Sequence, residues 1–337
     1  MHTVCFIGSG PSALFAAQRI VQKSSCMVHI LEKEIVPFGL ARYGIAPDHK
    51  DKEKFLHTFD SILRHERIKW IGNLPNLNPK SLLEKFDSVV LATGALNDRK
   101  LGIKGEDLPN VIPSSHFVKW YNGYPNIAPN FSLDSKNVVI VGHGNVALDC
   151  ARLLLKNPKD LQHTEIPESV LEYLKSSKVQ NIRIIGRRGP LQMSFSPQEL
   201  RELVEYQSCL VDKSFLGDVL DYNKEYLASL SNRKYKRMLT ILQSCSPPTE
   251  GRQWSIDYLK SPIEILGDSK CEQMTIRLNK LAKEDNPFNA KVIPTESIEH
   301  IPADLVIECL GYTSDSTGMH CDSQGTVYED GKPVLSV

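Results

Sequence analysis

The chain has 337 residues, 41% of them hydrophobic and 24% charged, and its 40 basic residues balance 40 acidic ones. This length allows two domains with a buried core. The composition is that of a globular protein rather than a disordered or fibrous one. Zero net charge disfavours nucleic-acid binding through overall charge. No run approaches the ~18 to 20 apolar residues of a membrane span. We therefore expect no nucleic-acid partner and no membrane span.

The eight cysteines are scattered and never form a C-x-x-C motif. Several lie in apolar, strand-like runs, where a thiol behaves as a small hydrophobic group. We expect free thiols in a reducing compartment, with a disulfide framework as the minor alternative. The first residues show no apolar signal region and no Arg-rich leader, so no targeting peptide is expected. No metal site is predicted.

The first hundred residues read as one doubly wound α/β unit. Val4–Gly8 is an apolar run that ends in glycine, and Pro11–Gln22 carries apolar residues at helical spacing. Val28–Glu32 and Ser88–Ala92 are further apolar runs, as expected of parallel strands covered on both faces.

The same pattern starts again at Asn137–Gly142, a strand that runs into glycines and is followed by an expected helix at Ala147–Leu155. Ile182–Gly186 is the next strand, after a polar insertion at residues 157–177. The fold class is therefore α/β with two Rossmann-like dinucleotide-binding domains. Later expected elements are a helix at Pro197–Tyr206, a basic helix at Lys224–Leu242, a Pro247–Pro248 loop, and strands at Glu272–Leu281 and Leu305–Cys309.

Gly8-Ser9-Gly10-Pro11-Ser12-Ala13 is a G-x-G-x-x-A turn between a strand and a helix. One glycine permits the sharp exit from the strand, the next lets the backbone approach a pyrophosphate, and the small third residue lets helix and strand pack closely. Glu32 ends the second strand 22 residues beyond Gly10, where a carboxylate binds ribose hydroxyls and repels a 2'-phosphate. This site suits FAD or NAD; a purely structural turn is the alternative.

Gly142-His143-Gly144-Asn145-Val146-Ala147 is a second G-x-G-x-x-A turn, and its following strand ends in Arg187 and Arg188. Two guanidinium groups replace the carboxylate and can bind a 2'-phosphate, the feature that separates NADP from NAD. A solvated surface pair of arginines is the alternative. Together the two turns indicate a flavoprotein with FAD first and NADP(H) second.

Longer blocks add a family resemblance. Val36–His49 strongly resembles the loop after the second strand in adrenodoxin reductase-type ferredoxin–NADP reductases. Further similar blocks follow in the family's order, at residues 117–123, 142–149, 186–192, 199–203 and 261–262. The resemblance implies a FAD domain (1–100), an inserted NADP domain (101–312) and a return segment to the FAD domain (313–337). It also implies electron flow from NADPH through FAD to a 2Fe-2S ferredoxin.

The resemblance also assigns residues. It implies FAD contacts at Gly8, Gly10, Pro11, Ser12, Ala13 and Glu32, and a flavin wall that includes Gly39 and Leu40. It implies NADP contacts at Gly142, Gly144, Asn145, Val146, Arg187, Arg188 and Glu199. His49 and Asp149 are similar to a family pair near the redox centre, a hydrogen-bond relay that positions the ring or conducts protons. From the residues alone, His49 is a surface histidine and Asp149 an acid in the first turns of a helix.

Arg233, Lys234, Lys236 and Arg237 place four positive charges in five residues. An acidic ferredoxin would be steered to such a cluster, although by composition alone it is a solvated helix face. The resemblance favours docking.

Family members continue past the strand expected at Pro333–Val337 into a segment that covers the flavin. From this we expect a truncated return segment and weaker FAD retention than in an extended chain. The alternative function is a nucleotide- or ferredoxin-binding protein without stable flavin. A disulfide reductase is largely excluded, because it needs a redox-active cysteine pair at C-x-x-C or C-x4-C spacing, and none is present. The family implies a mitochondrion or a related organelle, with the cytoplasm as alternative, and a monomer.

Overall fold

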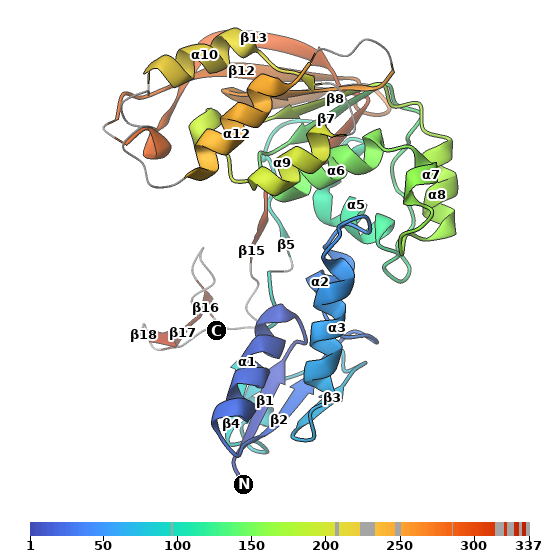
Figure 1. The fold of residues 1–337 in the computed structure, drawn as a ribbon, viewed down its shortest axis with the longest axis vertical. Coiled ribbons are helices and arrows are strands. Elements are labelled where there is room, and N and C mark those ends of the chain that lie inside the picture. Colours follow the sequence, from blue (N-terminus) through green and yellow to red (C-terminus); the bar gives the residue numbers. More distant parts are fainter. Residues whose placement is uncertain are drawn as a thin grey trace. The chain divides into compact units, whose positions relative to one another are not determined.

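The computed structural model describes the chain except residues 96, 206–208, 223–232, 247–250, 285, 314–319, 322–326, 330–331 and 335–337. The chain divides into two compact units (Figure 1). Unit 1 contains Met1–Arg99, Tyr121–Tyr124 and Tyr312–Val337, and unit 2 contains Lys100–Trp120 and Pro125–Gly311. None of the described helices is long and apolar enough to cross a membrane.

Unit 1 is built on a four-stranded parallel sheet in the order β3-β2-β1-β4. Its strands are β1 (Thr3–Ile7), β2 (Met27–Leu31), β3 (Ile68–Ile71) and β4 (Ser88–Leu91), and its helices are α1 (Pro11–Lys23), α2 (Leu40–Tyr43), α3 (Lys52–Leu63) and α4 (Pro79–Leu82). Apolar side chains of β1 and β2 pack against Ala13, Leu14 and Ala17 of α1 and against Phe59 and Ile62 of α3. The strands and the helix predicted for this half are confirmed.

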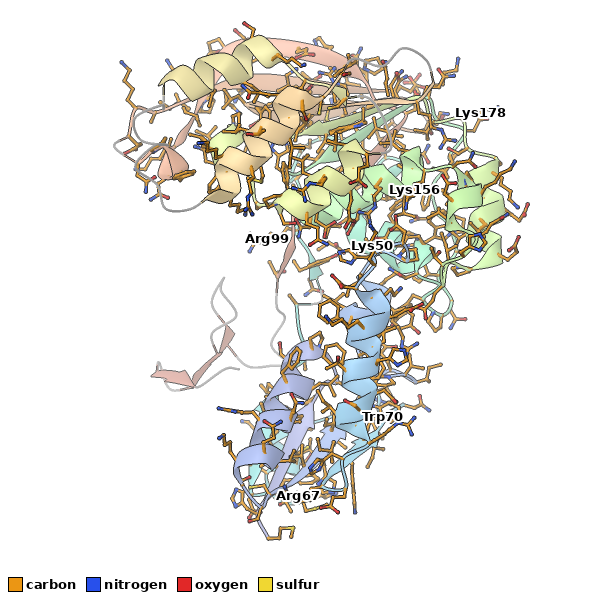
Figure 2. The ribbon with its side chains drawn as sticks, in the orientation of Figure 1. Lys50, Arg67, Trp70, Arg99, Lys156 and Lys178 are labelled. Atoms are coloured by element: carbon orange, nitrogen blue, oxygen red, sulfur yellow. The ribbon has the colours of Figure 1, made fainter. Side chains whose placement is uncertain are left out.

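Arg67 shows how α1 ends. Its guanidinium, labelled in Figure 2, donates hydrogen bonds to the carbonyls of Val21 and Ser24 at the carboxyl end of α1. These carbonyls have no partner within the helix, so a nearby cation stabilises its last turn. Short antiparallel strands complete unit 1: β5 (Asn97–Asp98) pairs with β15 (Tyr312–Thr313), and β16 (His320–Cys321), β17 (Val327–Glu329) and β18 (Lys332–Val334) form a small sheet.

Unit 2 has a six-stranded parallel sheet in the order β6-β14-β7-β8-β10-β9. The strands are β6 (Val111–Pro113), β7 (Asn137–Val141), β8 (Asn181–Ile185), β9 (Cys209–Leu210), β10 (Gln253–Asp257) and β14 (Leu305–Glu308). Its helices are α5 (Ser114–Tyr121), which ends at the unit boundary, α6 (Asn145–Leu155), α7 (Pro158–Leu161), α8 (Glu168–Lys175), α9 (Pro197–Val204), α10 (Lys213–Tyr222) and α12 (Arg233–Ser244), with 3-10 turns at Pro190–Gln192 and Pro287–Asn289. The fold class predicted from the sequence, α/β with parallel sheets, is confirmed.

A three-stranded antiparallel sheet packs against the parallel sheet of unit 2. It consists of β11 (Lys260–Leu266), β12 (Gln273–Leu281) and β13 (Val292–Pro302) in that order. Met274 and Ile276 of β12 share one buried cluster with Val139 and Val141 of β7 and Ile185 of β8. Of these three strands, the sequence predicted only β12.

The polar insertion predicted at residues 157–177 contains two short helices, α7 and α8, that the sequence did not predict. Pro158 occupies the first turn of α7, where a proline fits, since its missing N–H would have no helical partner. The Asn157 side chain caps that helix by accepting a hydrogen bond from the backbone N–H of Lys159. Pro167 is the N-cap residue of α8, a helix with three buried apolar residues. The prolines therefore mark helix starts.

The expected basic helix is α12, which begins at Arg233 in the structure. Residues 224–232 and the predicted Pro247–Pro248 loop lie outside the described residues. The strand expected from Pro333 is β18, of which residues 335–337 are likewise outside them.

Candidate dinucleotide-binding sites

The first glycine turn joins β1 to α1. Gly8 has a φ of +105°, and an added Cβ would lie 2.3 Å from the carbonyl oxygen of Ala92, so only glycine fits. Gly10 differs, because its added Cβ would meet nothing within 4 Å. Behind it, α1 begins at Pro11, and Ala13 is fully buried against the sheet. The open space at the amino end of this 13-residue helix fits a diphosphate.

The Glu32 carboxylate, directly after β2, reaches back to the same turn. Its Oε2 accepts hydrogen bonds from the backbone N–H of Ser9 at 2.8 Å and from the Ser9 hydroxyl at 2.7 Å. Its Oε1 accepts one from the N–H of Glu34 at 3.1 Å. A carboxylate has about four acceptor positions, so Oε1 keeps capacity for a further donor such as a ribose hydroxyl. Ser12, also expected at this site, is exposed in the first turn of α1.

The loop after β2 also lies against the first glycine turn. The N–H of Phe38 donates to the carbonyl oxygen of Ser9 at 3.1 Å. An added Cβ at Gly39, whose φ is +48°, would lie 3.4 Å from the Cα of Gly10. Leu40, the next residue, leaves 54% of its surface exposed. The structure therefore places Gly39, with Leu40 next to it in the chain, beside the same glycine turn that Glu32 contacts.

The second glycine turn joins β7 to α6. Gly142 has a φ of +136°, and its added Cβ would lie 2.2 Å from the carbonyl oxygen of Cys309. At Gly144 the nearest atom to an added Cβ would be the Ser194 hydroxyl oxygen, at 3.7 Å. Ala147 is fully buried in the first turns of α6. As at the first turn, one glycine is required by packing and the other faces space.

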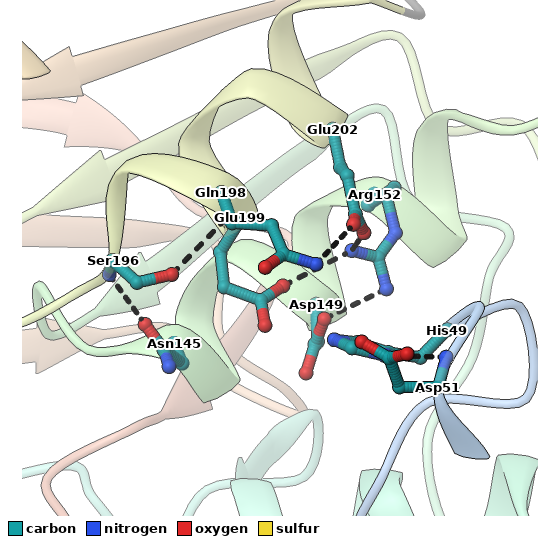
Figure 3. A network of polar contacts seen from close by, with 9 residues as sticks. All are labelled: His49, Asp51, Asn145, Asp149, Arg152, Ser196, Gln198, Glu199 and Glu202. Carbon is teal, nitrogen blue, oxygen red and sulfur yellow. Dashed lines mark hydrogen bonds and ion pairs between the residues drawn. The ribbon is translucent and has the colours of Figure 1, made fainter. Parts of the chain in front are cut away.

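The start of α9 is hydrogen-bonded to this second turn (Figure 3). Asn145 Oδ1 accepts a hydrogen bond from the backbone N–H of Ser196 at 2.8 Å. The Ser196 hydroxyl oxygen accepts one from the N–H of Glu199 at 3.2 Å, which makes Ser196 the N-cap residue of α9. Asn145 and Glu199, expected separately as NADP contacts, are thus linked through Ser196. Sequence reasoning missed Ser196, although Ser-Pro-x-Glu is a typical helix start. Val146 is partly buried between Asn145 and Ala147.

His143 occupies the variable position of the second turn. Its ring packs against Tyr258, with ring centroids 5.1 Å apart, and a Cβ on Gly186 would lie 2.5 Å from its ring atoms. Burial lowers the pKa of His143 to about 4, so the ring is neutral at pH 7. His143 therefore fixes the glycine turn against the end of β8. No sequence signal identifies such a residue, because any side chain fits the motif at this position.

Arg187 and Arg188 follow β8 after Gly186, and β8 is the neighbour of β7 in the sheet. Both arginines are exposed, and neither has an ion pair with any residue that the structure describes. Their backbone is held, because the Arg188 carbonyl accepts from the N–H of Leu259 and the Arg187 carbonyl from the side-chain amide of Asn279. Two available cations on a fixed backbone fit a bound phosphate group.

A buried arginine gathers three carboxylates between α6 and α9 (Figure 3). Arg152, only 1% exposed, pairs with Asp149 at 2.7 Å, with Glu202 at 3.3 Å and with Glu199 at 3.4 Å. This network orients both Asp149 and Glu199, two of the expected site residues. Sequence reasoning missed Arg152 and Glu202, because their contact joins two helices that are far apart in the chain. Arg152 and Glu199, for example, are separated by 47 residues.

His49 Nδ1 accepts a hydrogen bond from the N–H of Asp51 at 3.4 Å. His49 belongs to unit 1 and Asp149 to unit 2. Their expected relay remains a prediction.

The expected basic cluster lies on α12. Lys236 and Arg237 are exposed, whereas Met238 and Leu239 are fully buried. Lys234 is partly buried, with its Nζ 5.5 Å from the centroid of the Tyr235 ring. The Arg233 side chain lies outside the described part of the chain. The helix thus presents positive charge outward on an apolar base.

Each unit combines a parallel sheet, a glycine turn and an exposed helix N-terminus, which together define an α/β protein with two dinucleotide-binding folds. The family model for pyridine nucleotide-disulphide oxidoreductases matches residues 2–206. The chain is 35% identical to the mitochondrial NADPH:adrenodoxin oxidoreductase of Mus musculus, over 92% of this chain and 66% of that protein. It is also 35% identical to the NADPH-ferredoxin reductase FprA of Mycobacterium leprae, over 93% of this chain and 71% of that protein.

The solved structure of Mycobacterium tuberculosis FprA in complex with NADPH matches with a TM-score of 0.89 and 34% identity, over 97% of this chain and 75% of that one. The chain therefore belongs to the family of adrenodoxin reductases and FprA-type ferredoxin reductases, as the sequence predicted. It spans about two thirds of the length of the Mus musculus relative.

Proposed function

We propose that this chain is a flavoprotein oxidoreductase that takes electrons from NADPH through FAD and passes them to a 2Fe-2S ferredoxin. The observation that carries the proposal is the opposite charge beside the two glycine turns. A buried carboxylate, Glu32, lies at the first turn, and two exposed guanidinium groups, Arg187 and Arg188, follow the strand beside the second. A carboxylate accepts hydrogen bonds from ribose hydroxyls and repels a 2'-phosphate, whereas guanidinium groups bind a 2'-phosphate.

FAD is assigned to unit 1. Gly10 and the N-terminus of α1, with Pro11, Ser12 and Ala13, would hold the diphosphate, and Gly8 shapes the turn. Oε1 of Glu32 would accept a ribose hydroxyl, and Gly39 and Leu40 would line the flavin. Bound FAD supplies the conversion of a hydride into single-electron transfers.

NADP(H) is assigned to unit 2. The diphosphate would lie on Gly142, Gly144, Asn145 and Val146 at the start of α6, and the 2'-phosphate on Arg187 and Arg188. Glu199 would also contact NADP(H), since it is linked to the same turn through Ser196. His49 and Asp149 would hold or move a proton near the redox centre.

The purified chain tests this proposal directly. We expect flavin absorbance, bleached under anaerobic conditions by NADPH much faster than by NADH, and restored when an oxidised 2Fe-2S ferredoxin is added. Flavin that NADPH cannot bleach would overturn the assignment of unit 2. A colourless protein that FAD cannot reconstitute would instead support a nucleotide- or ferredoxin-binding protein without stable flavin.

Gly10→Ala should weaken FAD binding without unfolding the chain. The added methyl group touches no protein atom, but it occupies the space assigned to the diphosphate. Overpacking of this kind costs about 1 to 3 kcal/mol, so FAD affinity should fall roughly 5- to 150-fold. Titration of the apoprotein with FAD, followed by flavin fluorescence, measures the change.

Gly144→Ala is the matched control, because its methyl group makes only an ordinary contact, 3.7 Å from Ser194. This variant should keep FAD and lose NADPH affinity. Equal FAD affinity in the Gly10→Ala variant and the unchanged chain would refute the diphosphate position.

Ferredoxin docking is assigned to the α12 cluster formed by Arg233, Lys234, Lys236 and Arg237. Replacing the exposed Lys236 and Arg237 with Glu should slow ferredoxin reduction roughly 10-fold at low salt, because electrostatic steering raises association rates. Stopped-flow flavin reduction by NADPH should not change. High salt should shrink the defect.

Lys178→Glu provides the control, since Lys178 is also exposed in unit 2 (Figure 2). If the α12 variant loses ferricyanide reduction as much as ferredoxin reduction, the cluster serves the fold and not docking.

The relatives include a protein named mitochondrial and a mycobacterial one. A mitochondrion or related organelle, with the cytoplasm as alternative, and a monomeric state remain predictions.

A further inference from the structure

Two thiols meet at the edge of the unit 2 sheet, where β9 is the outer strand. Cys209 lies in the edge strand β9 and pairs in register with Trp254 of β10. Cys245 follows the last residue of α12 and donates a hydrogen bond from its sulfur to the Ile241 carbonyl at 3.5 Å. Both cysteines are only 2% exposed, and their side chains are hydrogen-bonded to each other. The proposed function uses neither.

The two thiols are chemically unequal. The hydrogen bond from Cys209 lowers the pKa of Cys245 by more than burial raises it, and the nearby charge of Lys213 lowers it further. The pKa of Cys209 is raised, mainly by burial and to a lesser extent by the hydrogen bond with Cys245. Asp257 and Tyr258 also face the pair. A thiolate is the nucleophile in thiol oxidation, so Cys245 is the sulfur that reacts first, with Cys209 beside it as the resolving thiol.

A second pair provides an internal comparison. Cys150 of α6 and Cys309 are also in hydrogen-bond contact, and Cys150 is buried like Cys209 and Cys245. Burial raises the pKa of Cys150 well above its usual range, and the charge of Arg152 does not offset this effect. Burial also raises the pKa of Cys5 to about 11 and of Cys271 to about 12. Contact alone therefore does not make a pair reactive.

We propose that Cys209 and Cys245 are an oxidation site, at which hydrogen peroxide converts the two hydrogen-bonded thiols into a reversible disulfide between β9 and the end of α12. This proposal concerns the chain's own thiols and does not depend on the proposed function. In the reduced chain both cysteines are free.

The reaction balances in two steps. The Cys245 thiolate attacks one peroxide oxygen, which breaks the O–O bond and gives a sulfenic acid, while the departing hydroxide takes up a proton and leaves as water. The Cys209 sulfur then attacks the sulfenic sulfur, forming the S–S bond and releasing a second water. Two thiols lose two electrons in total, and one peroxide gains them. A dithiol reductant reverses the reaction.

The test uses the full chain, reduced, desalted and treated with hydrogen peroxide. After alkylation of the remaining thiols under denaturing conditions, peptide mass spectrometry should find a disulfide between Cys209 and Cys245, lost again with dithiothreitol. It should form roughly 10-fold faster than any bond between Cys150 and Cys309. Circular dichroism before alkylation checks that the chain is folded.

Variants separate the two roles. Cys209→Ser should leave a sulfenic acid on Cys245 that dimedone traps, whereas Cys245→Ser should leave Cys209 reduced. Cys150→Ser is the matched control and should form the Cys209–Cys245 bond at the unchanged rate. If the folded chain oxidises at other cysteines first, or if Cys209 reacts without Cys245, the proposal is wrong. The measurement on the unchanged chain decides the matter even where a variant fails to fold.

Discussion

Replacing Arg187 and Arg188 together with glutamine should weaken NADPH binding roughly 100- to 1000-fold and leave NADH binding nearly unchanged. Each charge-assisted hydrogen bond to a phosphate contributes about 1.5 to 3 kcal/mol, and 1.4 kcal/mol corresponds to a factor of ten. Both arginines are exposed, so part of this gain is screened by solvent and salt. Affinities for the two coenzymes, measured side by side at low salt, give the ratio that reports on the 2'-phosphate.

A general loss of charge must be separated from a loss at this site. Arg64→Gln removes one positive charge, as each single variant at Arg187 or Arg188 does, from an arginine that is 77% exposed in unit 1, and it should not change the NADPH to NADH ratio. The single variants Arg187→Gln and Arg188→Gln show which guanidinium carries more of the preference. An equal loss for both coenzymes in the double variant would mean that the pair does not bind the phosphate.

Several strands of the parallel sheets could be predicted from the sequence because they are buried on both faces, whereas β3, β6, β9 and β10, which are short or partly exposed, were not predicted. Residues 138–141 of β7 are all buried, so the segment is apolar without interruption. β13 is the opposite case: only one of its eleven residues is buried, and prolines stand at positions 294 and 302. Such a strand is held by pairing with β12 and has no apolar run of its own. The antiparallel sheet was therefore mostly missed.

In the candidate sites, too, some residues could be predicted from the sequence and others could not. The glycine turns, Glu32 and the arginine pair follow from short spacings along the chain, so the sequence predicts them. The contact of His143 with Tyr258 joins residues 115 positions apart in the sequence, and that of Arg152 with Glu202 joins residues 50 positions apart. Those contacts exist only once β8 lies beside β10 and α6 packs against α9. No local pattern encodes them.

Arg152→Met should strongly destabilise unit 2. Methionine fills much of the arginine's volume, but Asp149, Glu199 and Glu202 then face one another without the guanidinium. Removing one partner from a buried ionic network costs about 3 to 5 kcal/mol. The free energy of unfolding at pH 7, measured by urea denaturation with tryptophan fluorescence, should fall by about that amount. Arg152→Lys should lose less, because a cation remains.

The pH dependence separates lost charge from lost packing. In the methionine variant, repulsion makes the folded state bind protons more readily than the unfolded state, so its stability should rise as the pH is lowered from 7 to 5. The double variant Arg152→Met with Glu202→Gln removes one of the three carboxylates and should recover part of the loss at pH 7, a non-additive result. A deficit of the same size at both pH values, with no recovery in the double variant, would show that Arg152 acts through its packing alone and does not hold Asp149 and Glu199 by charge.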